Sequence, residues 1–210
     1  MEPYDWNVIV AGAWNPAIFT PQRVAKNIFG LEEYSNVKVY VSVDGAAPTK
    51  IEYNGIIVAA SNNALVFSSE TNDFNKLVDL LESTIKTLEW LKETPIVAGG
   101  FNIRYKLSEE NALKIQDSLK CDVDGLFAQQ DFEISKTKLT KSLKYESGFI
   151  NIAFSDDKNG DFSIEMNFNL SSSDYNDIKE WFSISKEKLK TNVGKIINNT
   201  LGLNLEFQND

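Results

Sequence analysis

The sequence predicts an α+β protein in which antiparallel strand meanders pack against long helices. Apolar and polar residues alternate over 37–43, which is the period of a half-buried strand. The Asn-Gly pair at 54–55 predicts a tight hairpin, because both turn positions favour positive φ. Apolar residues at helical spacing over 73–92 and 174–200 predict a long helix after each meander.

The first half of the chain begins with a short apolar run at 5–13, which predicts a buried strand. Thr20 and Pro21 predict a helix start, since threonine caps well and proline fits the first helical position. Gly30 supplies the left-handed stop. A meander through Phe67 then leads to the first long helix.

The second half starts with a strand-like segment at 96–107, in which Gly99-Gly100 predicts a bulge or a close backbone approach. A helix is expected after Ser108, because acidic residues occupy its first turn. Three further strands are expected within 132–170 before the second long helix.

Both halves therefore follow the order βαβββα. Residues 1–94 and 95–210 are predicted to form two halves related by a pseudo-twofold axis, with a chance succession of common elements as the alternative. No linker rich in proline and serine separates them, so we expect rigid packing, either as two units or as one domain.

The composition removes several kinds of catalysis. The chain has no histidine, which excludes the usual Ser-His-Asp and Cys-His nucleophiles and histidine zinc sites. Cys121 is the only cysteine, so no intrachain disulfide or four-cysteine site can form. No ligand spacing specifies a metal, and no motif indicates a cofactor or a catalytic residue. An enzyme is therefore not the favoured reading.

Charge and hydropathy indicate the environment. The net charge is −9, with 30 acidic residues, and only two of the 21 basic residues are arginines. Both facts argue against nucleic acid as a partner. A lysine stretch at Lys136, Lys138, Lys141 and Lys144 either protects an edge strand or contacts a polyanion. No segment resembles a membrane span or a signal peptide, so we expect a cytoplasmic protein without membrane contact.

Five apolar residues are predicted to form a protein interface. Trp90 lies about 160° around its helix from Phe74, on the polar side. The loop at 14–19 also carries large apolar side chains between a strand and a capped helix, although such a loop can simply cover the core. The candidate interface residues are Trp14, Ile18, Phe19, Trp90 and Leu91.

The favoured function is a non-catalytic, protein-interaction subunit of an intracellular bacterial or viral assembly, or an immunity-type inhibitor of a basic partner. The alternative is a carboxylate- or Mg²⁺-dependent enzyme that acts on a small phosphorylated substrate. A third reading is a nucleic-acid-binding accessory subunit. An enzyme should show carboxylates converging in a cleft, and a nucleic-acid binder should show lysines from both halves on one face.

Overall fold

The computed structural model describes residues 1–32, 36–44, 46–119, 124, 127, 129–130, 133–157, 161–203 and 205. It confirms the α+β class. Its centre is one ten-stranded sheet in which all paired strands are antiparallel, in the order β3-β4-β5-β6-β2-β7-β10-β9-β8, with β1 beside β7. The strands are β1 Glu2–Pro3, β2 Asn7–Gly12, β3 Lys38–Tyr40, β4 Lys50–Tyr53, β5 Ile56–Ala60, β6 Ala64–Ser69, β7 Ile96–Lys106, β8 Lys136–Tyr145, β9 Gly148–Asp157 and β10 Asp161–Ser171.

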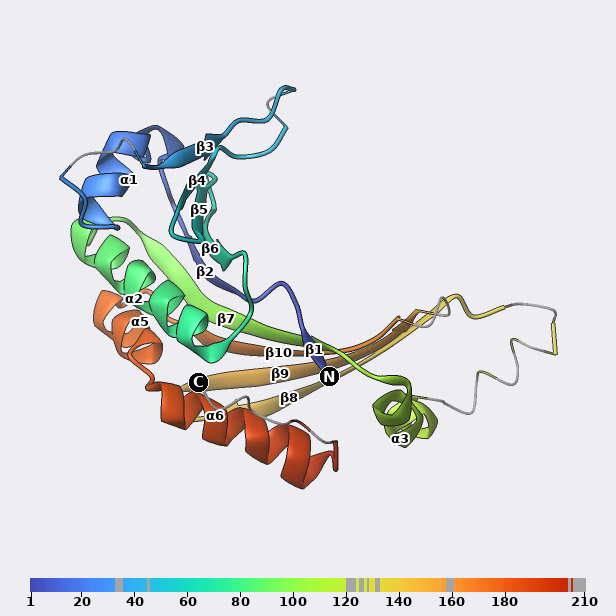
Figure 1. Ribbon diagram of the computed structural model, residues 1–210. Coiled ribbons are helices and arrows are strands. Elements are labelled where there is room, and N and C mark those ends of the chain that lie inside the picture. Colours follow the sequence, from blue (N-terminus) through green and yellow to red (C-terminus); the bar gives the residue numbers. More distant parts are fainter. Residues whose placement is uncertain are drawn as a thin grey trace.

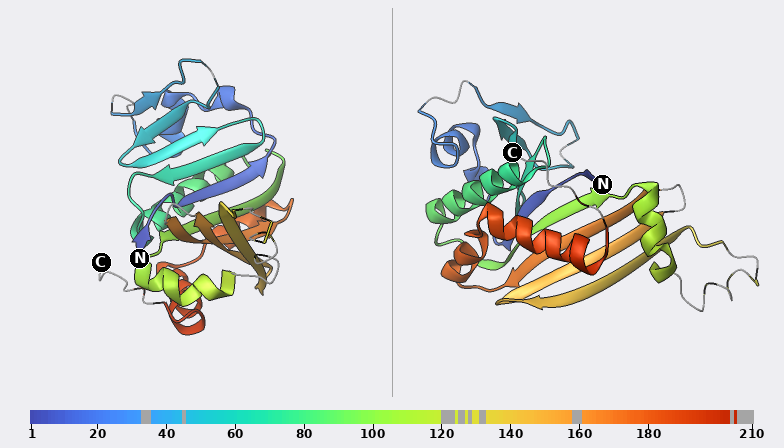
Figure 2. Two further views of the ribbon diagram at one scale, coloured as in Figure 1. Left: turned by 90° about the vertical axis from the view of Figure 1, so that its right-hand side faces the viewer. Right: turned by 60° about the horizontal axis from the view of Figure 1, so that its bottom comes forward.

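The helices lie on one side of this sheet (Figures 1 and 2). Helix α2 packs on β2, β5 and β6, and α5 packs on β7. The opposite face is concave, and no described helix covers it (Figure 1). The helices are α1 Pro21–Asn27, α2 Phe74–Trp90, α3 Glu109–Leu119, α5 Tyr175–Phe182 and α6 Lys186–Gly194, with short helical turns η1 Pro16–Ile18 and η2 Lys195–Thr200.

The first half contains two strands more than the predicted βαβββα order, namely the two-residue β1 before β2 and one further strand after α1. Between α1 and α2 the chain forms four strands, β3 to β6, whereas β8 to β10 form three in the second half. The extra strand after α1 arises because the alternating segment forms the short β3, separate from β4. The division at residues 94 and 95 stays a prediction. β2 of the first half pairs directly with β7 of the second half, so the two halves form one continuous sheet.

The prediction of one long C-terminal helix over 174–200 is wrong. The chain forms α5, then α6, then a π-helical turn, with a break at residues 183–185. Ser185 has an extended backbone, and its side chain accepts a hydrogen bond from Lys188 N, so it caps a new helix. Ser185 thus starts a second helix in a segment whose apolar spacing predicts one continuous helix.

Helix α2 is buried on a wider arc than the apolar stripe that the sequence predicts, which consists of Phe74, Leu77, Val78, Leu81, Ile85 and Leu88. Leu80, Thr84 and Thr87 are fully buried beside the expected leucines. The reason is that α2 contacts the sheet below it and α1, α5 and α6 at its sides. Each threonine hydroxyl donates to a backbone carbonyl four residues earlier, at 2.8 Å, which satisfies it inside the core.

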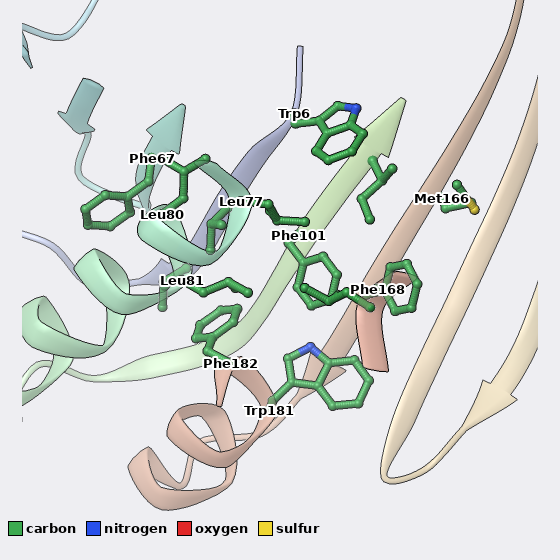
Figure 3. Packing of buried hydrophobic residues seen from close by; sticks show 14 of the residues in the cluster. Trp6, Phe67, Leu77, Leu80, Leu81, Phe101, Met166, Phe168, Trp181 and Phe182 are labelled. Carbon is green, nitrogen blue, oxygen red and sulfur yellow. The ribbon is translucent and has the colours of Figure 1, made fainter. Parts of the chain in front are cut away.

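Two glycine predictions are confirmed. Asn54 and Gly55 join β4 to β5 with φ of 51° and 77°. Gly99 lies directly beneath α5, where a Cβ would be 2.8 Å from Phe182 Cζ. Figure 3 shows the resulting core, in which Phe101 and Phe168 stack with ring centroids 4.6 Å apart, near Trp181 and Phe182. The sequence also predicts a tight turn at a second Asn-Gly pair, at 159–160, which lies outside the described residues.

Candidate functional site

The predicted interface residues gather at one end of α2. Turn η1, capped by Asn15, folds the loop after β2 over the helix end. Trp14 and Phe19 are buried there, and the Trp14 indole N–H donates to Val10 O at 2.9 Å. The Phe19 ring contacts Trp14 at 6.1 Å and Trp90 at 5.8 Å between centroids. A second layer of this protein thus covers Trp90.

Trp90, Leu91 and Ile18 are only partly buried against the core. The polar side of α2, where Trp90 was expected to be unsupported, is supported by Phe19. Contact of the five predicted interface residues with a partner protein stays a prediction. Two of them, Trp14 and Phe19, are buried within the chain.

Among the described residues, the largest group of exposed apolar side chains lies elsewhere, at the end of the sheet. Strand β3 is hydrogen-bonded to β4 on one side and is the last strand in the sheet order. Along and just beyond it, Val41 is 69% exposed and Val43 is fully exposed. Helix α1 contacts β4, where Ile51 is buried, whereas Val39 and Tyr40 on β3 are exposed. We call this group, Val39, Tyr40, Val41 and Val43, the valine edge.

The chain beyond β3 forms a protruding arm (Figure 1, top, light blue). Asp44 accepts hydrogen bonds from Ser42 Oγ and from Ala46 N, the second at 3.1 Å, as in an Asx turn. These hydrogen bonds lower the pKa of Asp44. Pro48 has no backbone N–H, which is consistent with a ladder that ends at the Tyr40–Lys50 pair. The arm therefore carries Val41 and Val43 away from the sheet that supports Val39.

A buried carboxylate fastens β3 to β4. Glu52 is 2% exposed, and its two oxygens accept hydrogen bonds from Lys38 Nζ at 2.7 Å and from the Tyr40 hydroxyl at 2.6 Å. The Lys38 and Tyr40 hydrogen bonds lower the pKa of Glu52, and the same bonds raise the pKa of Lys38 and of Tyr40. Each group is held in its ordinary charge state at neutral pH, so this trio is suited to structure and not to proton transfer.

The other end of the sheet is built differently. Strand β8 is ten residues long, pairs with β9, and closes the sheet order. Lys136, Lys138, Lys141 and Lys144 are all exposed on it. Lysines on an edge strand oppose the addition of another strand, because their charges would lose hydration or would repel like charges on the added strand. The predicted edge-strand role of the lysine stretch thus agrees with the position of β8.

The concave face of the sheet carries a row of amides across its centre. Residues directly opposite one another form a single line through nine strands. Successive hydrogen bonds of 2.7–3.1 Å link Asn151 to Asn167, Asn102 and Asn7. Asn102 and Asn7 are nearly buried by these contacts. A polar, internally bonded surface of this kind has little tendency to be covered by another apolar layer. The row consists of Ser142, Asn151, Asn167, Asn102, Asn7, Ser68, Ile57, Glu52 and Lys38.

Within the part of the chain that the structure describes, no group of three or more Cys, Asp and Glu side chains is placed to hold a metal ion. The same residues contain no helix that is both long and apolar enough to cross a membrane. Cys121 lies outside them. The chain matches no known protein-family model, no curated protein and no solved structure.

The valine edge had a signal in the sequence, although sequence reasoning did not assign it a role. The alternation of valine with polar residues over 37–43 was visible, and it predicts a strand with one apolar face. It does not say that the strand ends the sheet. Exposure of that face follows from the strand order, which is set by pairing between distant segments.

Proposed function

We propose that this protein is a non-catalytic interaction subunit that binds an extended segment of a protein partner along β3. The observation that carries the proposal is the valine edge, which begins on a strand with one free side and continues onto the arm beyond it. A free edge offers backbone groups for strand addition, and alternate side chains offer specificity. Exposed contiguous apolar groups are typical of interaction sites.

The partner that fits best is a basic protein. The chain carries a net charge of −9, so a partner of opposite charge is attracted and two copies of this chain repel one another. An added strand would place apolar residues beside Val39, Val41 and Val43, and its other face beside Lys38 and Tyr40. Because Glu52 already binds both of these side chains, the added strand meets no unpaired charge there. We also propose a cytoplasmic location, which suits a chain with one cysteine.

Site-specific photo-crosslinking tests the proposal. A benzophenone amino acid at Val43 should crosslink a partner in the native cell, whereas the same residue at Leu143, exposed on β8, should not. The captured protein is then purified and titrated against the wild-type chain. Val41→Lys/Val43→Lys should weaken this binding by at least tenfold without lowering the melting temperature, because both side chains are solvent-exposed.

Leu143→Lys is the matched control, since it makes the same chemical change on the lysine-rich edge. Equal loss of binding in this control, or full binding by the Val41/Val43 variant, would contradict the proposal. A partner that instead protects the amides of the concave face from hydrogen exchange would also contradict it. Dimerisation of the purified chain through β3 would show that the occupant is a second copy.

One observation favours a second candidate, nucleic-acid binding by the concave face. By the register of the sheet, Lys38 and Lys50 from the first half share this face with basic residues of the second. Two of these basic side chains already form ion pairs: Lys38 with Glu52, and Arg104 with Asp5 and Glu165. Their positive charges are therefore less available to phosphates. The second-half residues are Arg104, Lys106, Lys136, Lys138 and Lys144.

Fluorescence anisotropy with a labelled DNA duplex tests this candidate. Lys138→Glu/Lys144→Glu should weaken binding and reduce its salt dependence, because these lysines face the concave side. Lys141→Glu is the control, since Lys141 lies on the same strand and points to the other face. Equal effects of the two changes would indicate non-specific attraction.

A further inference from the structure

The register of the sheet determines which backbone groups of β3 face its free side. In an antiparallel ladder, pairs of residues that exchange two backbone hydrogen bonds alternate with pairs that exchange none. The two-residue turn at 54–55 closes on Tyr53 and Ile56, so these two residues form a hydrogen-bonded pair. Two positions along the ladder, Ile51 and Val58 form the next such pair. The backbone groups of Ile51 are therefore bonded to β5.

Val39 holds the backbone groups that β4 does not use. Because Ile51 bonds to β5, β4 bonds to β3 through the residues on either side of Ile51, which pair with Lys38 and Tyr40. Val39 lies opposite Ile51, so its N–H and C=O point away from β4, and no other described backbone group bonds to them. The side chain of Val39 is 42% exposed. A donor, an acceptor and an apolar side chain are thus available at one residue.

The outward backbone groups of β8 belong to residues of a different kind. The two-residue turn at 146–147 closes on Tyr145 and Gly148, so these residues form the hydrogen-bonded pair nearest the turn. The same alternation directs outward the N–H and C=O of residues 136, 138, 140, 142 and 144. Three of them are exposed lysines, namely Lys136, Lys138 and Lys144. An added strand would thus bond to β8 at charged residues, whereas it would bond to β3 at an apolar one.

We propose that the partner segment is an antiparallel strand with an apolar residue paired directly with Val39. This inference rests on the function proposed above and specifies the segment that the valine edge binds. All paired strands of the sheet are antiparallel. An antiparallel neighbour bonds to both backbone groups of Val39 through one residue, whereas a parallel neighbour needs two. A strand as short as β3 therefore favours the antiparallel arrangement.

The side chains of β3 specify the rest of the partner segment. Residues paired across a ladder have side chains on the same face, so the residue opposite Val39 extends the apolar face of the edge. The residues two positions to either side are also apolar, because they approach Val37 and Val41. The residues between them lie opposite Lys38 and Tyr40 and are not basic, because a like charge opposite Lys38 would be repelled. The basic residues of the partner therefore lie outside the paired segment.

Capped synthetic peptides test the pairing. In the probe, valine alternates with threonine between terminal lysines; one control is N-methylated at every valine, and the other at every threonine. N-methylation removes a backbone donor and keeps the side chain. The valine-methylated peptide should bind at least about tenfold more weakly than the probe, because its valine N–H groups would face β3. The threonine-methylated peptide should bind as the probe does, because its threonine N–H groups face away. Titration is followed on the amide ¹⁵N–¹H signal of Val39.

Val39→Pro tests the same contact on the protein. Proline has no N–H, and it is tolerated in an edge strand where that N–H faces outward. The variant should therefore keep its ladder with β4, seen as unchanged hydrogen exchange of the Lys38 and Tyr40 amides. It should bind the probe peptide at least about tenfold more weakly than the wild type. Val39→Ala is the control, because it shortens the side chain and keeps the N–H, and it should bind the probe more tightly than the proline variant.

Three results would overturn the inference. One is an amide of Val39 that exchanges as slowly as those of Lys38 and Tyr40 in the unbound wild-type protein, because an outward N–H should exchange faster. Another is an equal loss of binding for the two methylated peptides. The third is an unmoved Val39 signal at millimolar concentrations of the probe peptide.

Photo-crosslinking at Val43 distinguishes these results from a failure of the proposed function. A partner captured there whose binding survives Val39→Pro would refute the pairing at Val39 and leave the proposed function intact. Capture of no partner would refute the proposed function, while the peptides still report on the pairing at Val39.

Discussion

The two edge strands of the sheet present the same unpaired backbone groups, but their side chains differ in character: β8 carries charged lysines, and β3 leads into apolar valines. Strand β8 is ten residues long and exposes four lysines, while β3 is three residues long and leads into exposed valines. The single lysine of β3, Lys38, is bound to Glu52 and so does not repel an approaching strand. The comparison teaches that one edge is protected against strand addition and the other is not.

The largest expected effect comes from removing the protection of β8. Lys138→Val/Lys141→Val/Lys144→Val should make β8 resemble the valine edge, because valine favours strands and needs no desolvation of charge. We expect self-association at concentrations on the order of tenfold lower than for the wild type, measured by sedimentation velocity. The corresponding triple glutamine variant has the same net charge as the triple valine variant, and it should remain monomeric. Association of both variants to the same degree would mean that charge alone, and not the edge, controls solubility.

Much of the local structure could be predicted, because its causes lie close together in sequence. Thr20 caps α1 through Arg23 N, and Gly30 and Gly202 adopt the positive φ of helix stops. The break between α5 and α6 was missed because the apolar spacing continues through it, whereas a single serine cap decides the boundary. Local hydrogen bonds therefore outweighed periodicity at that place.

The strand order could not be predicted, and the sites depend on it. β2 pairs with β6 and β7, which joins the two groups of strands in one sheet and places β3 and β8 at its opposite ends. The exposure of Val39 follows from this order, and that of Val41 and Val43 follows from the arm beyond β3. The amide row likewise joins Asn7, Asn102, Asn151 and Asn167, residues that no sequence spacing relates.

The hairpin beneath β3 offers the next test. Gly55 has φ of 77°, so Gly55→Val should lower the free energy of unfolding by roughly 1–3 kcal/mol through backbone strain. Asn54→Gly, at the neighbouring left-handed position, is the control and should cost little. Chemical denaturation measures both. Because β4 carries β3, hydrogen exchange should quicken at residues 38–40 in the valine variant and stay constant in β8. Uniform quickening at both edges would argue against an independently sensitive β3.

A smaller effect is expected from Glu52→Gln. The change removes the negative charge that binds Lys38, although it keeps an oxygen that can accept from Tyr40. Amides of residues 38–40 should exchange on the order of five- to tenfold faster, with residues 136–145 unaffected. Glu165→Gln is a suitable control, because Glu165 pairs with Arg104 on the same face but not at an edge. Unchanged exchange in β3 would show that the backbone ladder alone holds the strand.

The smallest expected effect is a difference in acid sensitivity between the two edges. Because the pKa of Glu52 is lower in the folded chain than its ordinary value of 4.5, its interactions stabilise the fold above that value and are lost as the pH falls through the folded pKa. Lys38 and Tyr40 have raised pKa values, so their contribution is complete at neutral pH and is lost only as the pH rises beyond about 10. Hydrogen-exchange protection factors should therefore fall more in β3 than in β8 between pH 6 and pH 3, because β8 itself contains no carboxylate. Glu52→Gln should remove most of this difference, since glutamine does not titrate. If β3 in that variant still loses protection on acidification as the wild type does, then carboxylates elsewhere control the edge and Glu52 does not fasten it.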